Sequence, residues 1–142
     1  MTGAISNQRK QTALLYACVT TGCVIGSVAR YLAALALQWI PGLPWATLFV
    51  NVTGSFIIGL YATLSGPDGR LFANPQQRQF VMTGICGGYT TFSSFSLETF
   101  RLLHAGNSAA AFTNIGVSVV GWLLAVWLGH VLASRLNRLK GS

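Results

Sequence analysis

Four long runs of mostly apolar residues divide the chain, with short polar or glycine- and proline-rich segments between them. The runs cover residues about 14–37, 45–64, 79–103 and 109–133. Each is long enough to cross a bilayer, which needs about 20 such residues per helix. The separating segments contain the turn-forming residues that end helices. The pattern predicts an all-α membrane protein, a single domain over residues 1–142 with four transmembrane helices.

The third run differs from the others because its middle is a poor helix former. Three glycines and two threonines fall between Gly84 and Thr91, and each glycine costs about 1 kcal/mol relative to alanine. A break is therefore expected between Gly87 and Thr91. Inside a membrane, non-helical backbone is tolerated only where it is buried in protein or lines a wet cavity. Carbonyls that end one half-helix suit a cation, and N–H groups that begin the next suit an anion. The interruption predicts an ion site at mid-membrane.

Polar residues recur at helical spacing in three of the runs. They are Thr47, Asn51 and Ser55; Thr91, Ser94 and Glu98; and Asn114 and Ser118. An amide as deep as Asn51 is costly unless paired, so it is either an interhelical hydrogen bond or a pathway group. Cation pathways are ordinarily lined by carboxylate rings, and here Glu98 is the only carboxylate. These seams favour an anion pathway, and the alternative is that they only join helices.

Composition excludes several classes of protein. Apolar residues make up 52% of the chain and charged residues 8%, against about 25% charged in soluble proteins. The net charge of +7 does not indicate nucleic-acid binding, because the basic residues lie at the ends of apolar runs and form no patch. The three cysteines lie inside apolar runs and indicate neither a disulfide framework nor a metal pair. The sequence shows no pairing of a nucleophile with a general base, so no motif predicts an enzyme.

Glycines also recur at helical spacing, at Gly22 and Gly26 in the first run and at Gly54 and Gly59 in the second. Small residues let membrane helices approach closely. This pattern predicts tight helix contacts, either within one subunit or between subunits.

Three motifs resemble those of the Fluc fluoride channel family, and they occur in the same order and helices. They are residues 26–31, 51–56 and 87–96, and the resemblance extends over all four runs. It implies a fluoride-selective channel that lowers cellular fluoride by passive export. It also implies an antiparallel, dual-topology homodimer in the bacterial inner membrane, with two pathways lined by both subunits.

The resemblance also implies roles for individual residues. The fluoride pathway would be lined by Phe92, Phe95, Asn51, Thr47, Ser94, Glu98 and Ser118. The rims of the two phenyl rings carry partial positive charge and can face an anion, and Asn51 would donate a hydrogen bond to it. Arg30 would lie in an electropositive vestibule, and the carbonyls of Gly87 and Thr90 from both subunits would hold a structural sodium ion. Asn114 departs from the family, which often has tyrosine there, so an aromatic role is lost.

The distribution of basic residues predicts a fixed orientation. With four crossings, one side of the membrane carries Arg9, Lys10, Arg70, Arg78, Arg135, Arg138 and Lys140. The other side carries only Arg101. Such asymmetry favours one orientation, whereas an antiparallel dimer needs both.

Two other functions would also use four short helices or polar seams. A proton-coupled multidrug exporter needs a carboxylate in the first helix, where this chain has Arg30. A non-transporting scaffold would use the polar seams only to join helices.

Overall fold

The computed structural model describes residues 2–67 and 69–139, and within them every regular element is helical. Helices α1 (Thr2–Leu37), α2 (Trp45–Leu64) and α6 (Ser108–Arg138) are long and apolar enough to cross a membrane. The predicted all-α membrane fold is thus confirmed for the described residues. Lys140, which the sequence places in the basic tail, lies outside them.

The segment between α2 and α6 is divided into short helices. It contains α3 (Pro75–Gln79), the π-helix η1 (Phe80–Cys86), α4 (Gly87–Tyr89) and α5 (Phe92–His104). Because none of these pieces reaches the length of a membrane crossing, the fourth transmembrane segment, expected over residues 79–103, stays a prediction.

Two of the long helices extend beyond the apolar runs. Helix α2 has the predicted bounds, but α1 begins at Thr2 and α6 continues to Arg138. The 36 residues of α1 make a helix of about 54 Å, longer than the roughly 30 Å hydrocarbon core. Hydropathy locates only the part that suits lipid, and the helix itself continues past it. At the end of α6, Arg135 and Arg138 complement the helix dipole.

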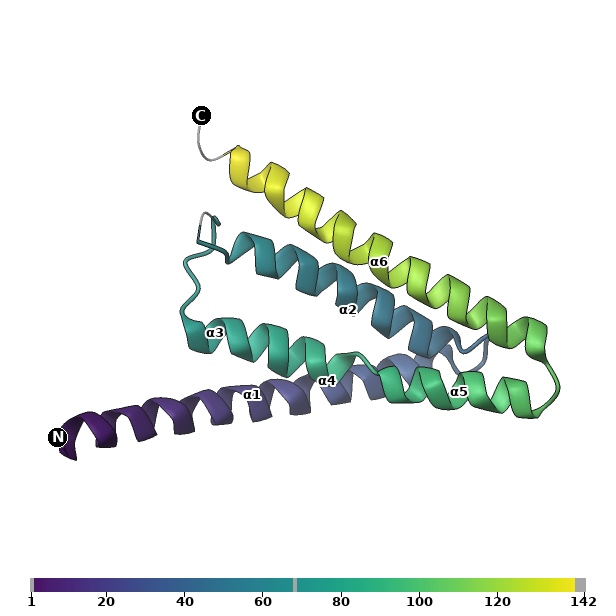
Figure 1. Cartoon of the computed structure of the whole chain (residues 1–142), viewed down its shortest axis with the longest axis horizontal. Coiled ribbons are helices and arrows are strands. Elements are labelled where there is room, and N and C mark those ends of the chain that lie inside the picture. The colour runs from purple at the N-terminus through teal and green to yellow at the C-terminus, as the bar shows by residue number, and fades with distance from the viewer. Residues whose placement is uncertain (1, 68, 140–142) are drawn as a thin grey trace.

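Successive segments run in alternating directions, so both termini lie on one side of the molecule (Figure 1). Helix α2 packs along α6, while α1 packs along the interrupted segment. The two pairs converge where α5 leads into α6 and diverge toward the termini (Figure 1).

Glycines bring α1 and the interrupted segment together. A Cβ atom at Gly26 would lie 2.2 Å from the Ile85 carbonyl oxygen, and one at Gly22 would lie 2.9 Å from the Gly84 Cα. On the opposite surface, a Cβ at Gly88 would also meet α1 backbone. The Gly22 and Gly26 contact is therefore made within one chain, which decides between the two arrangements that the sequence left open.

The α2 and α6 pair is built in the same way. A Cβ atom would lie 2.4 Å from the Val126 carbonyl oxygen at Gly59 and 2.3 Å from the Phe56 carbonyl oxygen at Gly129. Gly54, by contrast, faces the break, where its Cβ would meet the Thr90 methyl group. Gly54 and Gly59 therefore serve different contacts.

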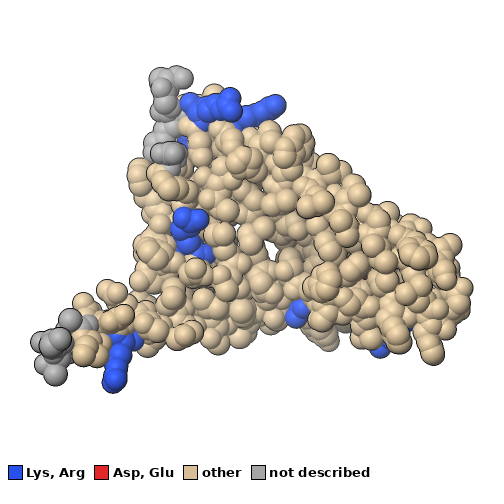
Figure 2. Space-filling view, in the orientation of Figure 1, with Lys and Arg blue, Asp and Glu red and all other residues tan. Residues whose placement is uncertain are grey.

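The exterior is apolar along the long helices. Val24, Leu123 and Leu124 are more than half exposed, as suits side chains that face lipid. Lys and Arg gather mainly on the side of the molecule that holds the termini (Figure 2). The structure therefore keeps the charge asymmetry that the sequence predicts.

Candidate functional site

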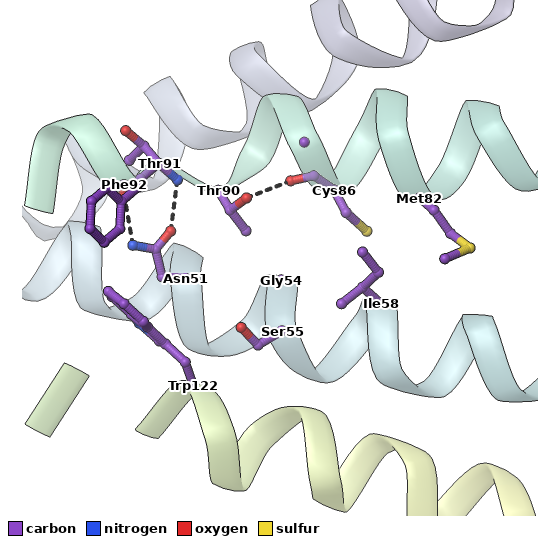
Figure 3. Close-up of a pocket in the computed structure, with 11 residues that line it drawn as sticks. Asn51, Gly54, Ser55, Ile58, Met82, Cys86, Thr90, Thr91, Phe92 and Trp122 are labelled. Atoms are coloured by element: carbon purple, nitrogen blue, oxygen red, sulfur yellow. Dashed lines mark hydrogen bonds between the residues drawn. The ribbon is translucent and has the colours of Figure 1, made fainter. Parts of the chain in front are cut away.

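The interrupted segment breaks at Thr90 and Thr91, within the range expected from the sequence. Both residues have extended backbone, with φ and ψ of −85° and 159° at Thr90 and −152° and 114° at Thr91. Asn51 of α2 holds this break with two hydrogen bonds (Figure 3). Its Oδ1 accepts from the Thr91 N–H at 2.7 Å, and its Nδ2 donates to the Thr91 carbonyl at 2.9 Å. The side chain of Asn51 thus replaces helical partners that the break removes.

This pairing changes the hydrogen bonding on the N-terminal side of the break. In a continuous helix the Thr91 N–H would bond to the carbonyl of Gly87, four residues earlier. It donates to Asn51 instead, while the N–H and hydroxyl of Thr90 both donate to the Cys86 carbonyl. The Gly87 carbonyl therefore lacks its usual helical donor.

Thr91 also begins the next helix. Its Oγ1 accepts from the Ser94 N–H at 3.1 Å, the usual bond of an N-cap threonine. The same hydroxyl donates to the Ser94 Oγ at 3.1 Å. Because the Ser94 hydroxyl accepts in this contact, its own hydrogen remains able to donate elsewhere.

A cavity of about 270 Å³ lies beside the break, and we refer to it as the central cavity. It is lined by Asn51, Gly54, Ser55, Ile58, Met82, Cys86, Gly87, Thr90, Thr91, Phe92 and Trp122 (Figure 3). Four of the predicted site residues, Asn51, Gly87, Thr90 and Phe92, are among them. Its polar groups are hydroxyls, an amide, a thiol, an indole and the backbone, so no ionised carboxylate faces it.

A second cavity of about 350 Å³, here the polar cavity, also has Thr91 in its lining. It is lined by Ser27, Arg30, Tyr31, Ala34, Ala46, Thr47, Val50, Thr91, Ser94 and Glu98. The Thr47 hydroxyl donates to the Glu98 Oε1 at 2.7 Å, and the Arg30 Nη1 donates to the Thr90 carbonyl at 3.5 Å. The structure thus brings four more predicted residues, Arg30, Thr47, Ser94 and Glu98, to one cavity.

A third cavity of about 330 Å³ adjoins the polar cavity at Glu98. Its lining includes Pro44, Glu98 and Arg101, at the turn that precedes α2 and along α5. Thr91 is shared by the first two cavities and Glu98 by the last two. The three cavities therefore form a series along the break and α5.

Three aromatic rings meet beside the central cavity. The ring centroids of Phe92 and Phe95 lie 5.5 Å apart, as expected from their spacing on one helical face. Trp122 of α6 contacts both edge-on, at 6.5 Å from Phe92 and 4.9 Å from Phe95. Phe95 is 7% exposed, whereas Phe92 is 70% exposed. Sequence reasoning missed Trp122, although it follows Ser118 by four residues and so continues the polar seam of α6.

Two predicted pathway residues, Phe95 and Ser118, do not line these three cavities. Phe95 packs against Trp122, and Ser118 is 2% exposed within α6. Asn114 is also buried, and its Nδ2 donates to the Thr99 Oγ1 at 2.9 Å. Asn114 therefore joins α6 to α5. The amide has a structural partner at this position, where the family often has a tyrosine.

Comparison with known proteins places this chain among close relatives. Residues 17–130 match the family described as CrcB-like protein, Camphor Resistance (CrcB). The fluoride-specific ion channel FluC 1 of Rhodopseudomonas palustris is 63% identical over 138 residues, covering 96% of this chain and 98% of that protein. FluC 1 of Bradyrhizobium diazoefficiens is 62% identical, with 96% of each chain covered. FluC of Opitutus terrae is 52% identical, with 90% of this chain and 98% of that protein covered.

Proposed function

This chain belongs to the CrcB-like family of fluoride-specific ion channels, and from that membership we propose that it exports fluoride passively across the bacterial cytoplasmic membrane. It is a multi-pass membrane protein of a family that is not enzymatic. The observation that carries the proposal is the series of cavities along the helix break, where neutral hydrogen-bond donors are held in place.

Fluoride binds water strongly, so a narrow pathway must replace that water with other donors. The Asn51 amide has two N–H groups and uses one for the Thr91 carbonyl. Its second N–H and the Ser94 hydroxyl can donate to an anion, one in the central cavity and one in the polar cavity. The edge of the Phe92 ring adds a partial positive charge beside the first of these. Together they give a dehydrated anion partners in both cavities that Thr91 lines.

The charged residues of the polar cavity act over a longer range. Arg30 lines this cavity and raises the local concentration of anions there. The hydroxyl hydrogen of Thr47 is committed to Glu98, so in this arrangement Thr47 acts on the ion through the Glu98 carboxyl group. Arg30 lies at the break itself, because its Nη1 donates to the Thr90 carbonyl, and Glu98 lies where the polar cavity adjoins the third cavity.

We further propose that two chains form an antiparallel homodimer with two fluoride pathways. The 70% exposure of Phe92, which nevertheless lines the central cavity, supports a second surface that completes the pathway. An added Cβ at Gly87 would meet no atom within 4 Å, so space is open beside a carbonyl that has lost its helical donor. These features fit a structural sodium ion held by the carbonyls of Gly87 and Thr90 from both subunits. Sodium would supply a positive charge to which both broken segments bind.

Mapping the accessible side of both termini tests the antiparallel arrangement directly. Cysteine tags at each end, labelled by an impermeant reagent in intact and opened cells, should reveal both orientations. A single orientation in all molecules would contradict the antiparallel dimer. It would indicate that the asymmetric distribution of basic residues fixes the orientation in the membrane.

Fluoride efflux from loaded proteoliposomes tests the proposed function. We expect fluoride but not chloride to leave, and we expect Phe92→Ile and Phe95→Ile to slow its release. Phe112→Ile is the matched control, because Phe112 is 68% exposed on α6 and lines none of the three cavities. Stable wild-type protein that releases no fluoride would instead support the scaffold, and proton-coupled efflux of an organic cation would support the exporter.

A further inference from the structure

Trp122 carries a buried hydrogen-bond donor that nothing nearby accepts. Its ring lines the central cavity, yet its Nε1 is covered by protein atoms and has no hydrogen-bond partner among the described residues. The side chain points from α6 toward Asn51 and Phe92 (Figure 3). An unpaired N–H in the interior of a membrane protein is unfavourable, so this one needs an explanation.

Packing alone does not require an indole at this position. The edge-on contacts with Phe92 and Phe95 use the ring, and a phenylalanine ring would supply similar contacts without burying a donor. Buried Trp N–H groups usually find a partner. An acceptor that enters the cavity would give this N–H the partner that the described part of the chain does not provide.

The position of Trp122 narrows the class of acceptor. Around the same cavity, Asn51 has an amide N–H beyond the one it gives to Thr91, and Phe92 presents a ring whose rim carries partial positive charge. Donors and aromatic edges that converge on one space suit a small anion.

We propose that Trp122 is an anion-binding residue of the pathway, whose indole N–H donates to fluoride in the central cavity opposite the Asn51 amide. This inference rests on the proposed function and adds a donor from α6 to it. The N–H is covered in this conformation, so donation to an ion requires a neighbouring side chain to move. Phe92 is the exposed candidate, because it contacts the indole and is 70% exposed. A turn of the Phe92 ring would open the donor to the cavity as the ion passes.

Replacement of Trp122 tests the proposal in the same efflux assay. Trp122→Phe keeps a ring and removes the N–H, and we expect fluoride release to fall by about tenfold or more, as for the loss of a hydrogen bond to a charged group. Trp127→Phe is the matched control, because Trp127 lies on the same helix and is 58% exposed. We expect it to release fluoride as the wild type does. If the wild type releases fluoride and Trp122→Phe equals it, the inference is overturned while the proposed function stands. If the wild type itself releases none, the proposed function fails first.

A spectroscopic measurement separates binding from a structural effect, even if Trp122→Phe folds poorly. Replacing Trp39, Trp45 and Trp127 by phenylalanine leaves Trp122 as the single indole. We expect fluoride to shift its emission in a saturable way, with an equal concentration of chloride as control. Emission that fluoride leaves unchanged, in a variant that still transports it, would overturn the proposal.

Discussion

Replacing Asn51 by alanine should destabilise the protein as well as slow fluoride transport. The substitution removes both hydrogen bonds between Asn51 and the backbone of Thr91. Asn51 is 5% exposed and Thr91 is 7% exposed, so bulk solvent does not reach the groups that lose their partners. Asn51→Ala therefore tests whether the break is held by this one side chain.

The magnitude follows from what happens to the freed groups. A hydrogen bond contributes about 1 kcal/mol net, and a buried group left unpaired costs about 1–3 kcal/mol. Two such bonds give roughly 2 kcal/mol if water from the central cavity reaches Thr91, and up to about 6 kcal/mol if it does not. We expect about 2–4 kcal/mol, because the roughly 270 Å³ cavity adjoins Thr91 and can admit water.

Reversible unfolding in mixed detergent micelles, followed by circular dichroism, measures this loss. Ser55→Ala is the control, because Ser55 lies one turn further along α2 and lines the same cavity, and none of the hydrogen bonds described above involves its side chain. We expect it to change the unfolding free energy by less than about 0.5 kcal/mol. If Asn51→Ala is as stable as Ser55→Ala, the two hydrogen bonds do not hold the break and our account of Asn51 is wrong.

Three further substitutions test other parts of the structure. Gly26→Ala should cost about 1–3 kcal/mol by overpacking against the η1 backbone. Gly116→Ala is the control, because its added Cβ would have no neighbouring atom within 4 Å, and it should leave the thermal unfolding midpoint equal or higher. Equal losses of stability in both variants would refute the close contact at Gly26. Thr47→Val removes the hydroxyl that donates to Glu98 and should slow fluoride efflux several-fold. Thr47→Ser keeps a hydroxyl and should keep the wild-type rate of efflux. Equal rates for both variants would show that transport does not use this hydroxyl. Gly87→Ala adds a methyl group where the single chain has open space, so the chain should fold normally. It should form less dimer in sedimentation experiments, and an unchanged dimer would contradict the proposed role of Gly87 at the dimer centre.

The location of the break could be predicted because its cause is local. Glycine and threonine are weaker helix formers than alanine, and the interruption at Thr90 and Thr91 lies in the expected range, while Gly84, Gly87 and Gly88 remain helical. The ends of α2 were also predictable, since Pro44 precedes it and Gly66 and Pro67 follow. Local composition is sufficient where a single element decides the outcome.

Features that depend on two elements were not predictable in the same way. The sequence left Asn51 open between an interhelical bond and a pathway group, and its partner is the backbone of Thr91, which shows no pattern of its own. The π-helix η1 packs on the glycines of α1, a contact between segments about 60 residues apart in the sequence. Trp122 was missed for the same reason, because only the fold places it against Phe92 and Phe95 of α5.

Asn51 and Trp122 both line the central cavity, but only Asn51 also holds the backbone of the break. Asn51 holds the break with one N–H and one oxygen, and only its remaining N–H can serve an ion. A loss of transport in Asn51→Ala therefore reports first on the backbone of the break. Trp122 differs, because its N–H has no partner to lose among the described residues. Asn51→Ala should lower both stability and fluoride efflux, whereas Trp122→Phe should lower efflux far more than stability. If the two variants lose both properties in the same proportion, Trp122 acts as a packing residue and the central cavity has no second donor opposite Asn51.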